Sequence, residues 1–293
     1  MNIIDCKEVR NQMLEEAKTK LDEFYHGENV KLKLVVIQVE GDAASDVYIR
    51  NKLKTCEQVG IECEHVKLPH DSDMFDVMGS ILYHSVQPET TGIMLQLPLP
   101  DHLKPYQQKL LDAIPWQMDV DGLSSASVGR LWTNQPCIAP ATAKGVMKLL
   151  PEDLSGKDVC IVGRSNLVGK PLIKLLEERN ATVTLCHSRT QHLAYYTERA
   201  NIIVSAIGKP KYFDSSYAFY DYDAVFGELF PDDQQTWIDV GINRDENGKL
   251  CGDIDIETFK DIDCNITPVP GGVGLLTTAQ LVLNVIDAYY LRH

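Results

Sequence analysis

Residues 157–171, KDVCIVGRSNLVGKP, constrain the fold of this chain more than any other segment. An apolar run over 159–162 ends at a glycine, and a polar turn, Gly169, Pro171 and a helical pattern follow. This order predicts a buried strand, a tight turn and a helix whose first backbone amides face the turn. Such a helix start favours phosphate, because unsatisfied N–H donors and the positive end of the helix dipole meet there. The segment therefore predicts a nucleotide site.

The segment matches the dinucleotide pattern G-x-G-x-x-G only in part, since it carries Gly163 and Gly169 alone. An NAD-binding unit usually places a carboxylate on the ribose about 20 residues further on. Here that place is taken by residues 187–190, HSRT, and Arg164 lies in the first turn. Donors in place of a carboxylate favour the additional phosphate of NADP. A solvated basic turn without a ligand is the alternative.

Length and composition narrow the class of protein. With 293 residues, the chain is long enough for two domains with separate cores. A net charge of −14 without a basic stripe argues against a nucleic-acid-binding surface. None of the eight cysteines forms a C-x-x-C pair, which is typical of reduced core thiols rather than a disulfide frame. The histidines show no ligand spacing, so we expect no metal.

The first residues lack the long apolar run of a signal peptide or membrane span. We therefore expect a cytoplasmic protein that does not bind membranes.

Strand and helix patterns alternate along both halves of the chain. In the first half, strands are expected at 31–39, 61–69 and 92–100, with helices at 45–60 and 74–87. The pattern loosens over 102–140, and a helix at 141–152 opens a second alternation with strands at 158–163, 182–187, 201–207, 236–242 and 265–269. Alternation of this kind predicts an α/β fold with parallel sheets covered by helices on both faces.

We place the domain boundary near residue 140, with the last helix, 277–291, packing back on the first domain. Ligands of open parallel sheets bind beyond the carboxyl ends of the strands. Two such sheets predict a cleft between the domains, with a cofactor on one wall and a substrate on the other.

Tyr48 and Lys52 lie four residues apart, so a helix places them on one face near this cleft. In a site poor in water the ammonium form is disfavoured, and Lys52 could then exchange protons near neutral pH. An exposed lysine beside a half-buried tyrosine is the alternative.

Two further segments carry candidate polar groups. Gln96, in GIMLQLPLP, is a neutral amide that could orient a lysine or a substrate carbonyl, or it could simply end a strand. Asp119 and Asp121 point the same way in an extended backbone. We favour one functional aspartate over a metal pair, with the other capping the turn before Gly122.

The loop 266–274, ITPVPGGVG, is rigid and lacks bulk, so it predicts close approach to a flat ligand. A purely structural loop is the alternative.

Taken together, these segments resemble the bifunctional methylenetetrahydrofolate dehydrogenase/methenyltetrahydrofolate cyclohydrolase family, often called FolD. The resemblance covers nearly the whole chain and rests on GDAAS, YIRNKLK, QLPLP, DVDGL, VGRSNLVGKP, TVTLCHSRT, IIVSAIGKP, IDVGIN and ITPVPGGVG in that order. It implies a folate-binding catalytic domain over 1–140 plus 277–293, an αβ sandwich with a parallel sheet. It also implies a Rossmann-like NADP-binding domain over 141–276.

The implied reactions are oxidation of 5,10-methylenetetrahydrofolate to 5,10-methenyltetrahydrofolate with NADP, and hydrolysis of the product to 10-formyltetrahydrofolate. By motif, Lys52 is the general acid/base of the hydrolysis and Gln96 positions it. Tyr48 stacks on the folate, and Asp121 accepts from the amino-bearing edge of the pterin. The other residues implied to contact the folate are Leu95, Leu97, Pro270, Gly271, Gly272 and Val273.

The resemblance also implies the cofactor contacts. Gly163, Arg164 and Ser165 bind phosphate, Ser188 binds the ribose phosphate, and Ile242 lies near the nicotinamide or its ribose. The remaining implied cofactor residues are Val168, Gly274 and Thr277. A homodimer is the implied assembly.

The chain departs from the family pattern at several positions. Leu275 and Leu276 stand where proline and methionine are usual, and Ala141 and Ala143 replace residues of P-C-T-P. Met118 replaces a lysine, and Ser124 and Ser125 replace a histidine–proline pair. A non-catalytic NADP-binding sensor and another two-domain NADP-dependent dehydrogenase, of the amino-acid or shikimate type, are therefore the alternatives.

Overall fold

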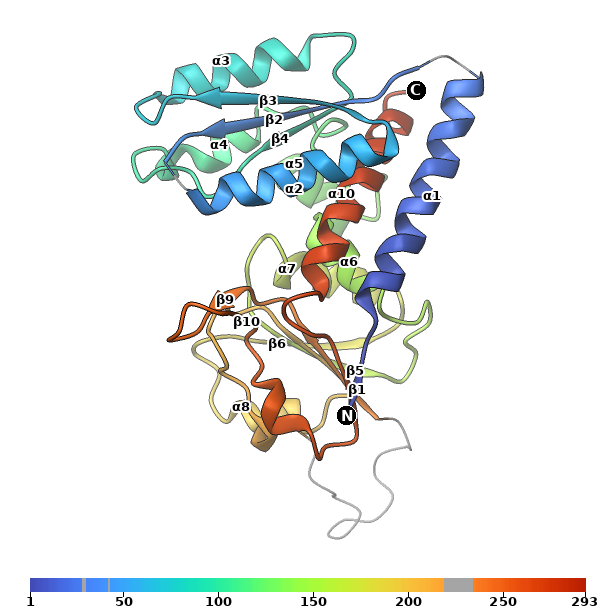
Figure 1. Ribbon diagram of the computed structural model, residues 1–293, viewed down its shortest axis with the longest axis vertical. Helices are drawn as coiled ribbons and strands as arrows, with labels where there is room; N and C mark the ends of the chain where they lie inside the picture. The colour runs from blue at the N-terminus through green and yellow to red at the C-terminus, as the bar shows by residue number, and fades with distance from the viewer. Residues whose placement is uncertain (28–29, 42, 219–233) are drawn as a thin grey trace. The chain divides into compact units, whose positions relative to one another are not determined.

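The computed structural model describes residues 1–27, 30–41, 43–218 and 234–293. The chain forms two compact α/β units, residues 11–141 with 277–293 and residues 1–10 with 142–276 (Figure 1). Each unit contains a parallel sheet, so the predicted α/β class is confirmed. None of the described helices is both long and apolar enough to cross a lipid bilayer.

The unit of residues 11–141 and 277–293 is built on a three-stranded sheet in the order β3-β2-β4. Its strands are β2 (Lys33–Val39), β3 (Glu62–Leu68) and β4 (Gly92–Leu95). Helices α2 (Ala43–Val59) and α3 (Met74–Ser85) lie on opposite faces of this sheet (Figure 1). Alternate residues of β2 point to each face, and Val35 and Ile37 pack with Val77 and Ile81 of α3.

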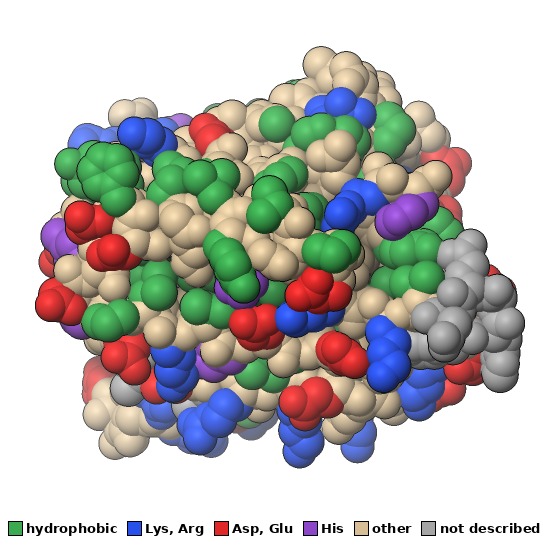
Figure 2. All heavy atoms as spheres, turned by 90° about the horizontal axis from the view of Figure 1, so that it is seen from above, with side chains coloured by type: hydrophobic (Ala, Val, Ile, Leu, Met, Phe, Trp, Pro, Cys, Tyr) green, Lys and Arg blue, Asp and Glu red, His purple; other side chains and the backbone are tan. Residues whose placement is uncertain are grey.

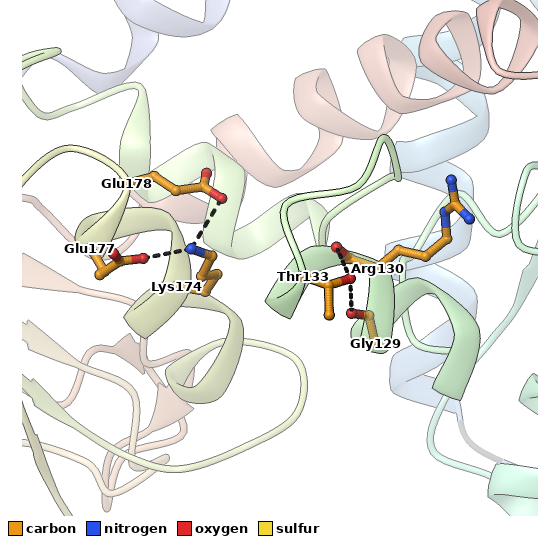
Figure 3. Close-up of polar contacts among 6 residues, drawn as sticks. All are labelled: Gly129, Arg130, Thr133, Lys174, Glu177 and Glu178. Carbon is orange, nitrogen blue, oxygen red and sulfur yellow. Dashed lines mark hydrogen bonds and ion pairs between the residues drawn. The ribbon is translucent and has the colours of Figure 1, made fainter.

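The remaining helices of this unit surround that sandwich. They are α1 (Cys6–Gly27), η1 (Lys104–Tyr106), α4 (Gln107–Leu111), α5 (Ser125–Trp132) and α10 (Val273–Tyr290). Helices α4 and α5 lie in the segment 102–140, where the pattern had loosened. Both are short. Thr133 ends α5 by donating its hydroxyl to Gly129 O at 2.8 Å and Arg130 O at 3.2 Å (Figure 3).

The second unit contains a six-stranded sheet in the order β1-β11-β8-β7-β5-β6, in which every neighbouring pair is parallel. The strands are β1 (Asn2–Ile3), β5 (Asp158–Val162), β6 (Thr182–Cys186), β7 (Ile202–Ser205), β8 (Gln235–Asp239) and β11 (Cys264–Ile266). Strands β9 (Asn243–Arg244) and β10 (Leu250–Cys251) form a separate antiparallel hairpin.

Apolar residues cover both faces of this sheet. Along β5, Val159 and Ile161 pack in one core cluster, whereas Cys160 and Val162 pack in another that contains Trp237. The helices of the unit are α6 (Ala141–Met147), α7 (Gly169–Glu177), α8 (Leu193–Thr197), η2 (Ser215–Tyr217) and η3 (Ile256–Phe259). In α7, the buried Lys174 is neutralised by Glu177 and Glu178 in the last turn (Figure 3).

The N-terminus differs from the expected domain division. We expected residues 1–140 in the first domain, but β1 pairs in parallel with β11, with Asn2 opposite Asn265 and Ile3 opposite Ile266. The first ten residues therefore belong to the second unit. A two-residue edge strand has too few residues to show a periodic pattern, which is why the sequence did not reveal it. Helix α10 also begins earlier than expected, at Val273 rather than at residue 277.

Candidate active site

Strand order brings two of the predicted polar residues together. Strand β2 lies between β3 and β4, so the segments that follow β2 and β4 are neighbours at the carboxyl edge of the sheet. Helix α2 follows β2 and carries Lys52, and Gln96 comes directly after β4. Gln38 of β2 fixes the start of α2 by donating its amide to Asp46 Oδ1 at 2.9 Å.

Lys52 is half-buried, and its ammonium group faces two neutral acceptors. Its Nζ lies 3.3 Å from Gln96 Oε1 and 3.3 Å from Met94 Sδ. The Gln96 amide nitrogen donates to Leu97 O, so the amide oxygen is turned toward the lysine. Met94 is fully buried, and sequence reasoning did not single it out.

Asp121 joins this pair through a segment that runs beside β4. Ile93 N donates to Met118 O at 2.8 Å, and Ile93 forms a parallel bridge with Asp119. Burial raises the pKa of the Asp121 carboxyl, and the neighbouring Asp119 raises it further. The positive charge of Lys52 opposes that rise, so the structure brings Lys52, Gln96 and Asp121 into one site.

The two aspartates of this segment have different surroundings. Asp119 is 1% exposed, and its Oδ2 accepts from Ser124 N and Ser127 Oγ, both at 2.8 Å. It thereby anchors the start of α5, whereas Asp121 remains half-buried. Among the described residues, no three His, Cys, Asp or Glu side chains are grouped to hold a metal.

A buried polar network holds the backbone next to Asp121. Asn284 of α10 donates to Val120 O at 2.8 Å and to Ala139 O at 3.1 Å, and it accepts from Gln280 at 3.0 Å. Sequence reasoning missed this support. The available signal was the pair of amide residues, four positions apart, inside an otherwise apolar helix.

The other three predicted folate contacts of this unit differ in how far their side chains are exposed or described. The Leu95 side chain is 1% exposed within the core, so its backbone is the part that a ligand can reach. Leu97 is half-buried. Tyr48 belongs to α2, but its side chain lies outside the described part of the structure.

In the second unit, β5 lies between β7 and β6, so the loops after β5 and β7 meet at the carboxyl edge. Gly163 has φ +131°, and a Cβ there would lie 2.3 Å from Ala206 O. A Cβ on Gly169 would lie 1.9 Å from Gly163 O. The turn predicted to bind phosphate is therefore closed by backbone packing that only glycine permits.

Donors surround this turn. Ser165 accepts from Val168 N at 3.1 Å, which shapes the turn, and Val168 itself is 8% exposed. Arg164, Ser165 and Ser188 are exposed, and Ser188 lies in the turn after β6. Among the residues that the structure describes, no carboxylate pairs with the Arg164 or Arg189 guanidinium. A glycine cradle with exposed donors and cations suits a phosphorylated ligand.

The other predicted cofactor residues lie further along the same edge or on α10. The Ile242 side chain is 45% exposed, and its Cδ1 would lie 3.3 Å from a Cβ on Gly274. Thr277 is half-buried on α10, in the unit of residues 11–141 and 277–293. In the glycine-rich loop, Pro270, Gly271 and Gly274 are exposed, whereas Gly272 and Val273 are buried.

Two buried carboxylates behind this edge were missed by sequence reasoning. Asp239 ends β8 and is 2% exposed; burial raises its pKa to about 7, although it accepts from Gly241 N, Asp253 N and Ile254 N. Asp253 is fully buried. The available signals were two glycines: Gly241, two residues after Asp239, and Gly252, directly before Asp253. Both carboxylates need backbone to approach closely, which glycine allows.

Comparison with known proteins agrees with this geometry. The family model "Tetrahydrofolate dehydrogenase/cyclohydrolase, catalytic domain" matches residues 4–121, and the model for its NAD(P)-binding domain matches residues 140–293. The chain belongs to the tetrahydrofolate dehydrogenase/cyclohydrolase family.

Relatives match this family member over their full length. It is 40% identical to the Bifunctional protein FolD of Agathobacter rectalis and 38% identical to that of Lactococcus lactis, over 98% of this chain in each case and 98% and 97% of the relatives. The crystal structure of the bifunctional enzyme FolD from Campylobacter jejuni has a TM-score of 0.90 at 35% identity, over 100% of both chains. FolD from Trypanosoma brucei, solved with NADP cofactor and an inhibitor, has a TM-score of 0.88 at 27% identity, over 99% of this chain and 97% of that one.

Most departures from the family pattern fall on packed positions. Met118, Ala141, Ala143 and Leu276 are buried apolar residues, and Leu275 is half-buried. Ser124 caps α5 by accepting from Ser127 N, and Ser125 donates to Asp112. The departures therefore leave Lys52, Gln96 and Asp121 in place.

Proposed function

We propose that this family member oxidises 5,10-methylenetetrahydrofolate with NADP and then hydrolyses the methenyl product to 10-formyltetrahydrofolate. The observation that carries the proposal is the cluster of Lys52, Gln96 and Asp121 at the carboxyl edge of the first sheet. A donor-lined glycine turn at the carboxyl edge of the second sheet supports the use of a dinucleotide.

NADP, when bound, supplies the acceptor for hydride. Gly163 and Gly169 would let the phosphates approach the backbone, and Arg164, Ser165 and Ser188 would bind them. Ile242 and the loop 270–274 would provide the surface for the nicotinamide end. The role of these residues is to bind and orient, which is the main requirement of hydride transfer.

Loss of hydride leaves a cationic amidinium on the folate, and a permanently charged neighbour would oppose this step. Lys52 faces the neutral Gln96 amide and Met94 sulfur, so a proton can leave its Nζ without breaking an ion pair with either of them. The neutral amine then takes a proton from the water as its oxygen attacks the methenyl carbon. The ammonium returns this proton to N5 as the C–N5 bond breaks, and the hydroxyl proton of the adduct is released as the formyl C=O forms. Asp121 would hold the amino-bearing edge of the pterin at a fixed distance from Lys52.

Lys52→Met tests this assignment. The variant should hydrolyse supplied 5,10-methenyltetrahydrofolate at least about 100-fold more slowly, which is the usual contribution of a positioned general base. Its affinity for NADP should remain that of the wild type. Lys54→Met, which changes an exposed lysine on the same helix, should leave hydrolysis unchanged. If Lys52→Met hydrolyses the substrate at the wild-type rate, Lys52 is not the general base.

We also propose that the protein is a cytoplasmic homodimer. Its eight cysteines are free thiols, six of them buried, which suits a reducing compartment.

The proposed dimer surface lies on the first sheet and α3. Strand β3 lies at the edge of its sheet. Helix α3 exposes an apolar stripe, defined as Phe75, Leu82, Tyr83 and Val86. Figure 2, a view from above Figure 1, shows apolar side chains among charged ones on this face. An open strand edge near such a stripe is typical of an interface.

A further inference from the structure

Asp253 is a buried carboxylate that connects the two loops at the carboxyl edge of the second sheet. It is fully buried and lies in the segment after β10, outside the sheet itself. Its Oδ2 accepts from Ser205 Oγ at 2.9 Å and from Ile207 N at 2.8 Å, with Gly208 N at 3.4 Å. Its Oδ1 accepts from Lys209 N and from Asn243 Nδ2, both at 2.9 Å.

These donors come from two segments. Ser205 ends β7 and residues 207–209 form the loop after it, whereas Asn243 begins β9 in the segment after β8 and is the neighbour of Ile242. The loop after β7 packs directly on the phosphate turn, since a Cβ on Gly163 would lie 2.3 Å from Ala206 O. Asp253 therefore connects the backbone of the loop after β7 to the side chain of Asn243 in the segment after β8.

Glycines make this arrangement possible. A Cβ on Gly241 would lie 2.3 Å from Asp253 Oδ1, and a Cβ on Gly252 would lie 1.9 Å from Asp239 Oδ2. Asp239 in turn accepts from Asp253 N at 3.0 Å, which holds the Asp253 backbone against the end of β8. The segment that presents Asp253 is thus bound to the sheet at its own backbone as well as through its carboxylate.

We propose that Asp253 is a positioning residue for the dehydrogenase reaction: it holds the loops after β7 and β8 in the geometry that binds the nicotinamide end of the cofactor. The inference rests on the proposed use of NADP. Asp253 is fully buried and acts through the backbone of residues 207–209 and the side chain of Asn243, so it need not touch substrate or cofactor. An asparagine cannot replace it, because an amide has one acceptor oxygen and would direct its own N–H groups at donors.

Asp253→Asn tests the proposal with a readout that does not need the reaction. Titration calorimetry should show NADP binding weakened about 10- to 100-fold, as expected when charge-assisted hydrogen bonds are lost. The dehydrogenase KM for NADP should rise by a similar factor. Hydrolysis of 5,10-methenyltetrahydrofolate, measured without NADP, should stay at the wild-type rate, because Lys52 lies in the other unit.

Asp153→Asn is the matched control. Asp153 precedes β5 in the same unit and accepts from the same kinds of donor: Ser155 N, Ser155 Oγ and Asn180 Nδ2. It lies far along the chain from the loops after β7 and β8, so its replacement should change neither NADP affinity nor hydrolysis.

Wild-type NADP affinity in Asp253→Asn would overturn the proposal, and so would an equal loss of hydrolysis and NADP binding. If Asp253→Asn does not fold, Ser205→Ala decides, because it removes the buried hydroxyl that donates to Asp253 Oδ2. Weaker NADP binding by Ser205→Ala supports the proposal, and unchanged binding contradicts it. A wild-type enzyme without dehydrogenase activity would instead contradict the proposed function.

Discussion

Asp119 and Asp121 lie two residues apart but have different surroundings, and the proposed folate site uses only Asp121. The Oδ2 of Asp119 accepts hydrogen bonds at the start of α5, whereas Asp121 is half-buried near Lys52. Its raised pKa follows from burial, and ionisation would be harder still without the lysine. In the proposed role, the amino hydrogens at the edge of a pterin would donate to this carboxylate.

The raised pKa predicts how folate binding depends on pH. In the proposed role the ionised form of Asp121 would accept from the pterin. The group gains its proton at a higher pH than an ordinary aspartate, because its pKa is raised. The KM for 5,10-methenyltetrahydrofolate should therefore rise on acidification while the pH is still above 3.8, the ordinary value. Asp121→Asn should raise this KM at pH 7 by about tenfold or more and remove the pH step.

The surface variant Asp101→Asn is the control. Asp101 is exposed on the same unit, and among the described residues its one ion pair is with Lys104. It should keep the wild-type pH profile. A pH step that persists in Asp121→Asn would show that another group controls folate binding.

At the scale of elements, α3 provides a test of the proposed assembly. Leu82 is 51% exposed within the apolar stripe of Phe75, Leu82, Tyr83 and Val86. Burying such a stripe against a second copy would remove its apolar surface from water, and a carboxylate placed there would oppose association. Size-exclusion chromatography with light scattering should give twice the 32.8 kDa chain mass for the wild type and one chain mass for Leu82→Asp.

Trp132→Asp is the matched control, because Trp132 is 49% exposed on α5, outside the stripe. It should remain dimeric. A monomeric wild type, or a dimeric Leu82→Asp, would contradict the assignment of this surface.

The elements that could be predicted are those whose pattern is long and apolar. The expected strand at 158–163 corresponds to β5, and the expected helix at 74–87 corresponds to α3. Strand β1 and the β9–β10 hairpin could not be predicted, because each strand has two residues and takes its position from its partner. Helices α4 and α5 have only five and eight residues. The start of α5 is held by Asp119 and Asp112, which accept from Ser124 N and Ser125 N, rather than by a periodic pattern.

The same reasoning applies to the site. Lys52, Gln96 and Asp121 were recognisable because each belongs to a short motif at the end of a strand or on the helix that follows it. Asn284 and Asp253 were not, because they bind the backbone of segments more than 40 residues away in sequence. Pairings of this range are set by the tertiary fold, and no local pattern reveals them.

At the scale of the whole molecule, the two units contribute different chemistry to one reaction sequence. The unit of residues 11–141 and 277–293 carries Lys52, Gln96 and Asp121, and the unit of residues 1–10 and 142–276 carries the glycine turn with its donors. A chain of this kind that had lost turnover could still bind NADP as a sensor. Binding of the cofactor by itself therefore does not test the account, whereas turnover of the folate does.

The most direct measurement is a spectrophotometric time course of the purified full-length protein with NADP and 5,10-methylenetetrahydrofolate. The account predicts that absorbance from NADPH rises, and that acidified samples of the mixture contain the methenyl chromophore formed from the oxidised folate. Supplied 5,10-methenyltetrahydrofolate should lose its absorbance in the same preparation as it is hydrolysed. A folded protein that binds NADP but produces neither signal would contradict the account.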